Sequence, residues 1–306
     1  MAGLAAVSVD LDEIRCYADI HGLPQPEGPA ARAVWSCALP RLLALFEAED
    51  VRATFFVVDR DLEEPSNRTA LRLILEGHHE VANHTYAHRY DLTRLGADEM
   101  ARDVRRAQDA IAEATGTPPA GFRAPGYVVT DRLLEVLADA GLRYDASVFP
   151  CPAYYAAKAA VMGAMRLAGR QSRSVLDDPR ALLSPADPYR MGRPHWRRGD
   201  GLIELPIGVT PRARLPYIGT SLVMAGERGA TMLTRLMHSR PLVSLELHGI
   251  DLADAHEDGL EFLAPHQPDL RRSAVRKHAI LRAVIASLRA AGREFVTLAE
   301  AADRFT

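Results

Sequence analysis

Hydrophobic and polar residues alternate between two patterns along most of the chain. Short apolar runs rich in β-branched residues, typical of buried strands, are separated by segments with apolar positions three and four residues apart, typical of amphipathic helices. We interpret as strands residues 5–11, 53–58, 80–83, 121–123, 142–145, 202–209, 242–248 and 295–296. We interpret as helices residues 30–50, 68–76, 98–115, 130–140, 231–238 and 271–290, with a closing helix after residue 296.

Strands that alternate with helices predict a parallel sheet with the helices packed outside it. We therefore expect an α/β fold, a closed or nearly closed (β/α) barrel, formed by residues 1–306 as a single domain. In such barrels the functional side chains lie where strands end and loops begin.

One segment interrupts the alternation. Residues 151–201 are rich in Arg, Pro and small residues, with a helix expected over residues 156–167 and a loop over residues 185–198. Because long loops in compact domains are usually functional, we interpret this segment as an insertion that forms a lid over the barrel mouth. Its aromatic and basic side chains suit sugars and phosphates, and they suit a solvated loop equally well.

The composition is that of an ordinary globular protein, with 48% hydrophobic and 25% charged residues. The net charge of -3 argues against a nucleic-acid partner, which would require a basic excess. The three cysteines form no metal-binding pair and are expected to be structural thiols. The chain has no apolar stretch long enough to cross a membrane, and residues 1–6 lack the basic start of a secretory signal. We therefore expect a cytoplasmic protein, with its oligomeric state left open.

Two aspartates end the first predicted strand. Asp10 and Asp12 lie two residues apart, so both side chains point to the same face at the carboxyl end of that strand. Taken alone, the pair fits a solvated strand end as well as it fits a site.

A pair of histidines supplies the second signal. His84 and His88 lie four residues apart, and we expect them on one face of a helical turn, a spacing that suits a divalent metal. Together with Asp12 they form a set of two histidines and one carboxylate, with positions left open for water and substrate. Two surface histidines at this spacing also occur by chance.

Two more signals follow later strands. Arg123 precedes a Pro125-Gly126 turn, and its guanidinium suits a paired hydrogen bond to a carboxylate, although a surface arginine beside a structural turn has the same pattern. His248 ends an apolar strand and is a candidate acid or base, although a lone histidine is usually structural.

Taken in order, these signals resemble the polysaccharide deacetylase family, also called the NodB-homology or carbohydrate esterase family 4 domain. The resemblance rests on five motifs: Ser8-Val9-Asp10-Leu11-Asp12, His84-Thr85-Tyr86-Ala87-His88, Arg123-Ala124-Pro125, Tyr144-Asp145-Ala146-Ser147-Val148-Phe149-Pro150 and Leu245-Glu246-Leu247-His248. It implies a distorted seven-stranded (β/α) barrel and a metal-dependent hydrolase of carbon–nitrogen bonds. It also implies roles for seven residues: Asp10 as base, Asp12, His84 and His88 as metal ligands, His248 as acid, Arg123 holding the base, and Asp145 supporting the acid.

The chain departs from the family pattern at two positions. Leu11 separates the two aspartates, which are adjacent in the usual motif, so the resemblance is to a branch with Asp-x-Asp. Gly126 stands after Pro125 where the family usually has an aromatic residue, and Tyr127 follows. We expect the Gly126 N–H to serve the oxyanion, with Pro125 and Tyr127 beside the substrate.

The expected reaction is metal-assisted hydrolysis of an amide. The resemblance implies zinc, and cobalt, nickel or iron(II) accept the same ligands. For a cytoplasmic chain the expected substrate is an N-acetylated amino sugar, nucleotide-linked, lipid-linked or part of a small metabolite. A deformylase or a hydrolase of other linear or cyclic amides is the closest alternative. A non-catalytic carbohydrate-binding relative and a non-haem iron oxygenase are alternatives of other classes.

Overall fold

The computed structural model describes residues 3–305, so Met1 and Ala2, which begin the N-terminal segment considered above, lie outside the described residues. The strands are β1 (Leu4–Asp10), β2 (Ala53–Val57), β3 (Glu80–Asn83), β4 (Gly121–Phe122), β5 (Tyr144–Asp145), β6 (Tyr189–Met191), β7 (Arg198–Glu204), β8 (Leu242–His248) and β9 (Glu294–Phe295). The α-helices are α1 (Ile14–His21), α2 (Leu39–Ala48), α3 (Pro65–Glu76), α4 (Ala97–Thr115), α5 (Asp131–Asp139), α6 (Pro152–Leu167), α7 (Gly219–Met237), α8 (Ala274–Ala290) and α9 (Leu298–Arg304).

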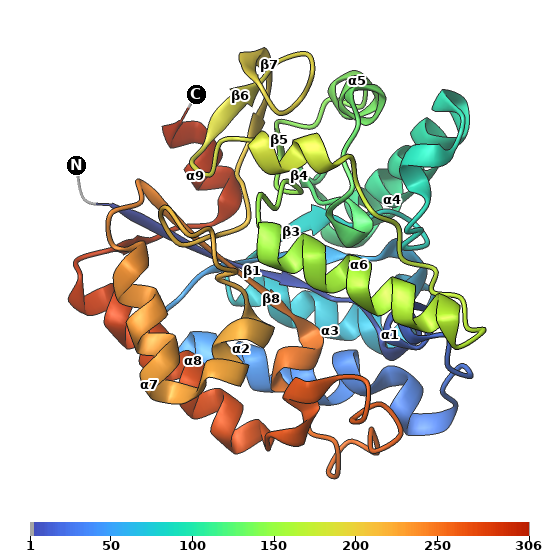
Figure 1. Ribbon diagram of the computed structural model, residues 1–306, viewed down its shortest axis with the longest axis vertical. Helices are drawn as coiled ribbons and strands as arrows, with labels where there is room; N and C mark the ends of the chain where they lie inside the picture. Colours follow the sequence, from blue (N-terminus) through green and yellow to red (C-terminus); the bar gives the residue numbers. More distant parts are fainter. Residues whose placement is uncertain (1–2, 306) are drawn as a thin grey trace.

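The strands of the described residues form one sheet in the order β6-β7-β5-β4-β3-β2-β1-β8. The seven strands from β7 to β8 run parallel, and β6 is antiparallel to β7 at one end. β9 pairs with residues 4–5 of β1, whereas β2 pairs with residues 7–10, so the two strands divide one edge of β1. The sheet curls, with helices packed around its outside (Figure 1), which confirms the predicted barrel-like α/β fold.

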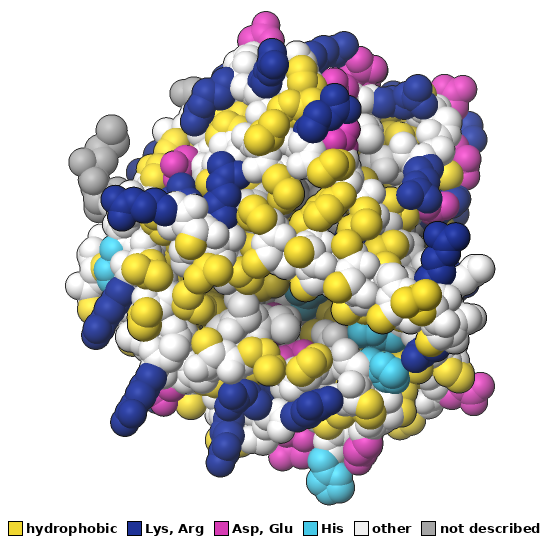
Figure 2. Space-filling view, in the orientation of Figure 1, with side chains coloured by type: hydrophobic (Ala, Val, Ile, Leu, Met, Phe, Trp, Pro, Cys, Tyr) yellow, Lys and Arg dark blue, Asp and Glu magenta, His cyan; other side chains and the backbone are white. Residues whose placement is uncertain are grey.

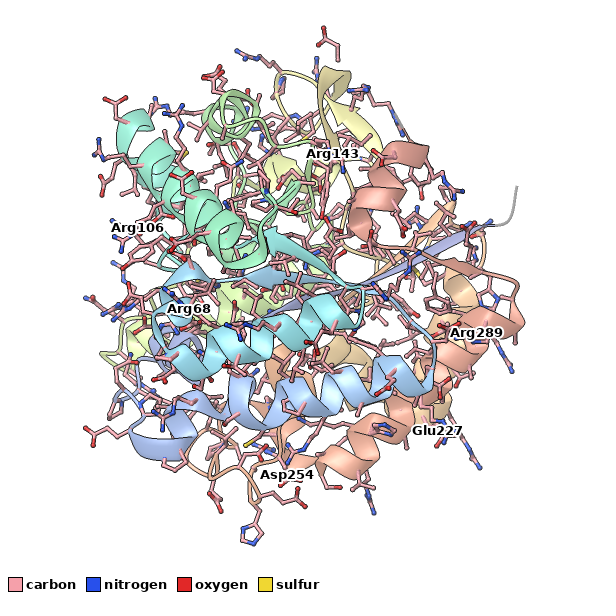
Figure 3. The ribbon with its side chains drawn as sticks, turned by 180° about the vertical axis from the view of Figure 1, so that it is seen from behind. Arg68, Arg106, Arg143, Glu227, Asp254 and Arg289 are labelled. Carbon is pink, nitrogen blue, oxygen red and sulfur yellow. The ribbon has the colours of Figure 1, made fainter. Side chains whose placement is uncertain are left out.

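The centre of the sheet is buried because both of its faces are covered. All seven residues of β1 are buried, as parallel strands covered on both sides require. Leu42 and Phe46 of α2 pack in one core cluster with Phe55 of β2 and Leu245 of β8. Seen from behind, α2 and α3 cross this side of the sheet and α4 lies beside them, with Arg68 on α3 and Arg106 on α4 at the same surface (Figure 3).

Strand register brings the motif residues to one end of the sheet. Asp10 is paired with His248 across β1 and β8, and with Phe56 across β1 and β2. Asn83, Phe122 and Asp145 follow one another in register across β3, β4 and β5. His84 and Arg123 are the residues directly after β3 and β4, so four of the five motifs meet β8 at the carboxyl edge of the sheet.

Some predicted elements differ from the structure. Residues 14–21 form α1, where no helix was expected, and α7 begins at Gly219 rather than at residue 231, with a kink at Gly226. The predicted loop over residues 185–198 contains β6, which is added to the edge of the sheet. Two of these errors share a cause: the short helix α1 and the edge strand β6 depend on neighbours more than on their own periodicity.

The segment over residues 151–201 contributes both to the sheet and to the cover of the site. α6 lies across the front of the molecule (Figure 1), and the chain returns through β6 to the sheet. Within residues 3–305, no helix combines the length and the apolar character that crossing a membrane requires.

Candidate metal centre and active site

A buried ion pair lies at the end of β1. Nη1 of Arg123 donates to Oδ1 of Asp10 at 2.5 Å, Nη2 donates to Ser8 Oγ at 3.0 Å, and Nε donates to the Ala146 carbonyl at 2.8 Å. Arg123 is fully buried, and every contact fixes the plane of its guanidinium. This pairing confines Oδ1 of Asp10 and leaves Oδ2, which is 3.9 Å from Nε2 of His84.

Three buried side chains converge beside this pair. Oδ1 of Asp12 lies 3.2 Å from Nε2 of His84 and 3.1 Å from Nε2 of His88. None of these three atoms has a hydrogen-bond partner among the described residues, although all three are buried. Buried polar atoms without partners are rare in folded proteins, so their convergence here points to a missing ligand.

The donor set fits a divalent cation. One carboxylate oxygen and two imidazole nitrogens are ligands that zinc and other first-row divalent ions accept. Nδ1 of His84 lies 2.8 Å from the Arg123 carbonyl oxygen, so this nitrogen carries the proton and Nε2 is left to bind. Asp12 follows β1 rather than lying within it, yet it reaches the same cavity as Asp10, as the sequence predicts.

The two histidines meet through a loop and not through a helical turn, so that part of the prediction is wrong. Thr85 and His88 have positive φ values of 68° and 52°, which a helix excludes. The Asn83 side chain accepts from Thr85 N at 2.8 Å, and the Thr85 hydroxyl accepts from His88 N at 3.0 Å. These bonds fold the loop back on itself and bring the two imidazole rings to 4.9 Å between centroids.

His248 faces Asp10 from the neighbouring strand. Its Nδ1 is 3.0 Å from Oε1 of Glu246, and its Nε2 is 3.2 Å from the hydroxyl of Tyr127, which donates to the same Glu246 oxygen at 2.7 Å. Burial lowers the pKa of His248, but the negative charges of Glu246, Asp10 and Asp12 outweigh it and raise the pKa to about 9. The imidazole is therefore protonated at neutral pH, as a general acid requires.

Glu246 is the functional residue that the sequence reasoning missed. It is fully buried two residues before His248, where strand alternation alone would place it on the same face. A carboxylate within an otherwise apolar strand is the signal that could have identified it.

Asp145 does not support the acid, contrary to the role that the resemblance implied. Its Oδ1 accepts from Ser147 Oγ at 2.5 Å, and that hydroxyl accepts from Ala124 N at 2.8 Å. Its neighbour across β5 and β7 is Glu204, and burial raises the pKa of both carboxyl groups, so the pair retains a proton. Asp145 thus stabilises the turn that carries Arg123, the residue that pairs with the proposed base Asp10.

The three residues predicted to contact substrate from the turn after β4 do not all line the cleft. Pro125 is buried and does not line the cleft, so it fixes the turn rather than contacting substrate. Gly126 lines the cleft with φ at 65°, and a Cβ there would lie 3.1 Å from the Tyr90 ring. Tyr127 lines the cleft and holds both Glu246 and His248.

The cleft itself has a volume of about 370 Å³. The predicted site residues that line it are Asp10, Asp12, His84 and His248. Helix α6 contributes Tyr154, Ala157, Lys158, Val161 and Met162 to the lining. Figure 2 shows the hollow on this face, with acidic and histidine side chains at its floor and apolar side chains around its rim. His21 and His266 also line it, with their rings 5.4 Å apart.

The comparisons with known proteins agree with this arrangement. Residues 27–144, which include His84, His88 and Arg123, match the family model described as polysaccharide deacetylase. A peptidoglycan deacetylase of Helicobacter pylori is 28% identical over 148 residues, which are 47% of this chain and 49% of that protein. Over residues 27–144 the chain is similar to the polysaccharide deacetylase family. The stretch that matches the family model does not include Asp10, Asp12 or His248. The fold places these three residues beside His84, His88 and Arg123, which it does include.

Solved structures support the polysaccharide deacetylase fold. A Mycobacterium smegmatis protein classed as a polysaccharide deacetylase superposes with a TM-score of 0.62 at 18% identity, covering 100% of this chain and 91% of that one. A Bacillus anthracis protein described as a pseudoenzyme of carbohydrate esterase family 4 superposes with a TM-score of 0.52 at 14% identity, covering 99% of this chain and 66% of that one. The chain spans about half the length, or less, of the curated relatives it matches.

Proposed function

We propose that this protein is a metal-dependent hydrolase that removes an acyl group, the N-acetyl group in the first instance, from an amino sugar. The observation that carries the proposal is the convergence of three buried, unpartnered ligand atoms of Asp12, His84 and His88 next to an arginine-held aspartate and a protonated histidine. A structural role explains neither the unpartnered atoms nor the imidazolium across the cleft.

The roles of the side chains follow from their contacts. A divalent ion held by Asp12, His84 and His88 would polarise the acyl carbonyl and the attacking water. Asp10 accepts the proton of that water through the oxygen that Arg123 does not hold. His248 donates a proton to the departing amine, and Glu246 and Tyr127 keep its ring in place. We assign the Gly126 N–H to the oxyanion, where one well-placed donor contributes about 3–4 kcal/mol in other enzymes.

The cleft supports a sugar as the substrate. Tyr17, Tyr90, Tyr127 and Tyr154 line it, and such aromatic faces suit the apolar faces of sugar rings. We interpret α6 as a lid, so shortening the segment over residues 151–201 should weaken substrate binding more than metal binding. The choice of zinc among the acceptable metals and the cytoplasmic location stay predictions.

The deciding experiment is an acyl-release assay by mass spectrometry, on acetylated and formylated amino sugars with metal-loaded and chelator-treated protein. We expect release that requires metal, and a fall in kcat of about 10²–10⁴-fold in Asp10→Asn with the metal still bound. The kcat of His248→Ala should fall by a similar factor. Near-normal turnover in both variants with metal bound would exclude these roles.

The same assay separates the alternatives. Release of formyl but not acetyl groups would identify a deformylase on the same site. Sugar binding without release from any compound would favour a non-catalytic relative.

A further inference from the structure

We propose that a second, arginine-lined cavity beside the metal ligands binds a phosphate or diphosphate group of the substrate. This inference rests on the proposed function and specifies its substrate class. The cavity has a volume of about 760 Å³, and five arginines line it. We call it the arginine cavity and define it by Arg15, Arg60, Arg89, Arg94 and Arg173.

The arginines come from segments far apart in the sequence. Arg15 lies on α1, which follows β1, and Arg60 lies in the turn Asp59–Glu63, which follows β2. Arg89 and Arg94 follow the histidine loop after β3, and Arg173 follows α6. The carboxyl ends of adjacent parallel strands bring these residues together, at the edge of the sheet where ligands bind in such folds.

The arginine cavity borders the catalytic cleft, because several residues line both. His88, one of the proposed metal ligands, lines the cavity. Tyr90, Ser172 and Ser174 line both the cavity and the cleft, and the Tyr90 ring packs edge-on against the His88 ring at 4.7 Å between centroids. A substrate whose amide lies at the metal ligands can therefore extend past Tyr90 into the cavity.

Part of the positive charge in the cavity is not compensated. Arg89 is paired with Asp91, and Arg173 is paired with Asp19, so the two aspartates that line the cavity are both engaged. Arg60 and Arg94 are exposed, and neither side chain forms an ion pair or hydrogen bond with another described residue.

A third donor in the cavity is buried without an acceptor. Arg15 contacts Asp61 through Nη1, whereas its Nη2 is buried and has no hydrogen-bond partner among the described residues. A buried donor left unsatisfied is costly, so an acceptor that enters from the cavity would stabilise it.

This chemistry favours a phosphate over a neutral sugar ring. A guanidinium presents paired N–H groups that match phosphate oxygens, whereas neutral hydroxyls gain little from a cluster of cations. Two uncompensated guanidinium groups, of Arg60 and Arg94, together with the unpartnered Nη2 of Arg15, suit an anion with several charged oxygens better than a single carboxylate. Nucleotide-linked and lipid-linked amino sugars both carry such a group.

The first test measures binding without turnover. The affinity for inorganic pyrophosphate is measured by calorimetric titration at fixed ionic strength. The protein is treated with chelator beforehand, so that pyrophosphate cannot bind through a metal ion. We expect Arg60→Gln/Arg94→Gln to bind about tenfold more weakly than wild type or worse. The matched control is Arg105→Gln/Arg132→Gln, which removes two exposed arginines that have no ion pair and do not line the cavity. Equal affinity in wild type and both double variants would overturn the proposal.

The second test measures substrate preference with metal-loaded protein. The panel contains one N-acetylated amino sugar in free, nucleotide-linked, short-prenyl-diphosphate-linked and carboxylated forms. We expect a phosphate-containing form to be preferred, and Arg60→Gln/Arg94→Gln to raise its KM about tenfold with little change in kcat or in turnover of the free sugar. The preferred form distinguishes the nucleotide from the lipid source.

The outcomes separate this inference from the proposed function. Acyl release with equal kcat/KM for free and linked forms, or a preference for the carboxylated form, would overturn the phosphate site and leave the hydrolase intact. A second outcome is that no compound releases an acyl group, while the protein binds pyrophosphate and Arg60→Gln/Arg94→Gln abolishes this binding. That outcome would contradict the proposed hydrolase function and support the phosphate site.

Discussion

Nδ1 of His248 lies 3.0 Å from Oε1 of Glu246, two residues earlier on the same strand. Strand alternation turns both side chains to one face, and the register of β8 with β1 places His248 opposite Asp10. The acid and the base are therefore held by one ladder of backbone hydrogen bonds. Glu246 adds a buried negative charge that raises the pKa of His248.

The first prediction concerns the pH dependence of turnover. Activity should fall as pH rises through the pKa of His248, which is about 9, because the deprotonated imidazole cannot donate to the amine. Glu246→Gln removes the largest of the charges that raise this pKa, so the alkaline limb of the kcat–pH profile should move down by about one unit or more. Tyr127→Phe keeps that charge and should leave the limb near its wild-type position. An unmoved limb in Glu246→Gln would contradict the pairing.

The second prediction tests the reassignment of Asp145. Burial raises the pKa of this carboxyl to about 6, so the folded protein binds a proton there that the unfolded chain has released. Its contribution to stability is therefore present below about pH 4 and is lost as pH rises through about 6. Asp145→Asn removes this titration, so the difference in Tm between variant and wild type should change over that window. The alkaline limb of the kcat–pH profile should not move in Asp145→Asn. A downward shift like the one expected for Glu246→Gln would instead support the role of Asp145 beside the acid, His248.

The third prediction uses two glycines with positive φ. Gly126 (φ 65°) would place a Cβ 3.1 Å from Tyr90, whereas Gly141 (φ 77°) has nothing within 4 Å of that position. Gly126→Ala and Gly141→Ala should each cost about 1–2 kcal/mol in the free energy of unfolding, because both force alanine into the left-handed region. Only Gly126→Ala should reduce kcat, because it displaces the turn at the cleft. Equal kcat in the two variants would argue against a role of this turn in catalysis.

The fourth prediction concerns metal and stability. A divalent ion that binds the folded chain at one hundred times its Kd should stabilise it by about 2.7 kcal/mol, which thermal unfolding with and without chelator measures. Asp12→Asn should abolish most of this increase because it removes a charged ligand, whereas Asp145→Asn should retain it. A metal-induced rise in Tm that persists in Asp12→Asn would place the ion elsewhere.

The sequence predicted the fold class and most site residues for identifiable reasons. Buried parallel strands are largely apolar runs, so β1, β2 and β8 were visible from hydrophobicity alone. The motif residues directly end or follow such strands, and the carboxyl ends of parallel strands share one edge, so Asp10, His84, Arg123 and His248 could be expected together. His88, a few residues beyond β3, reached the same point by backbone geometry that no periodicity encodes.

What the sequence by itself determined was the alternation of elements and the identity of residues near strand ends, because both follow from local period and covalent order. Only the tertiary structure decided which carboxylate faces which cation: Glu246 rather than Asp145 pairs with His248, and Asp145 shares its proton with Glu204. It also decided that five arginines from separate segments surround one cavity. The physical reason is that strand register and loop closure set the distances between charges, and burial sets how strongly those charges act, and neither quantity is a property of a local stretch of sequence.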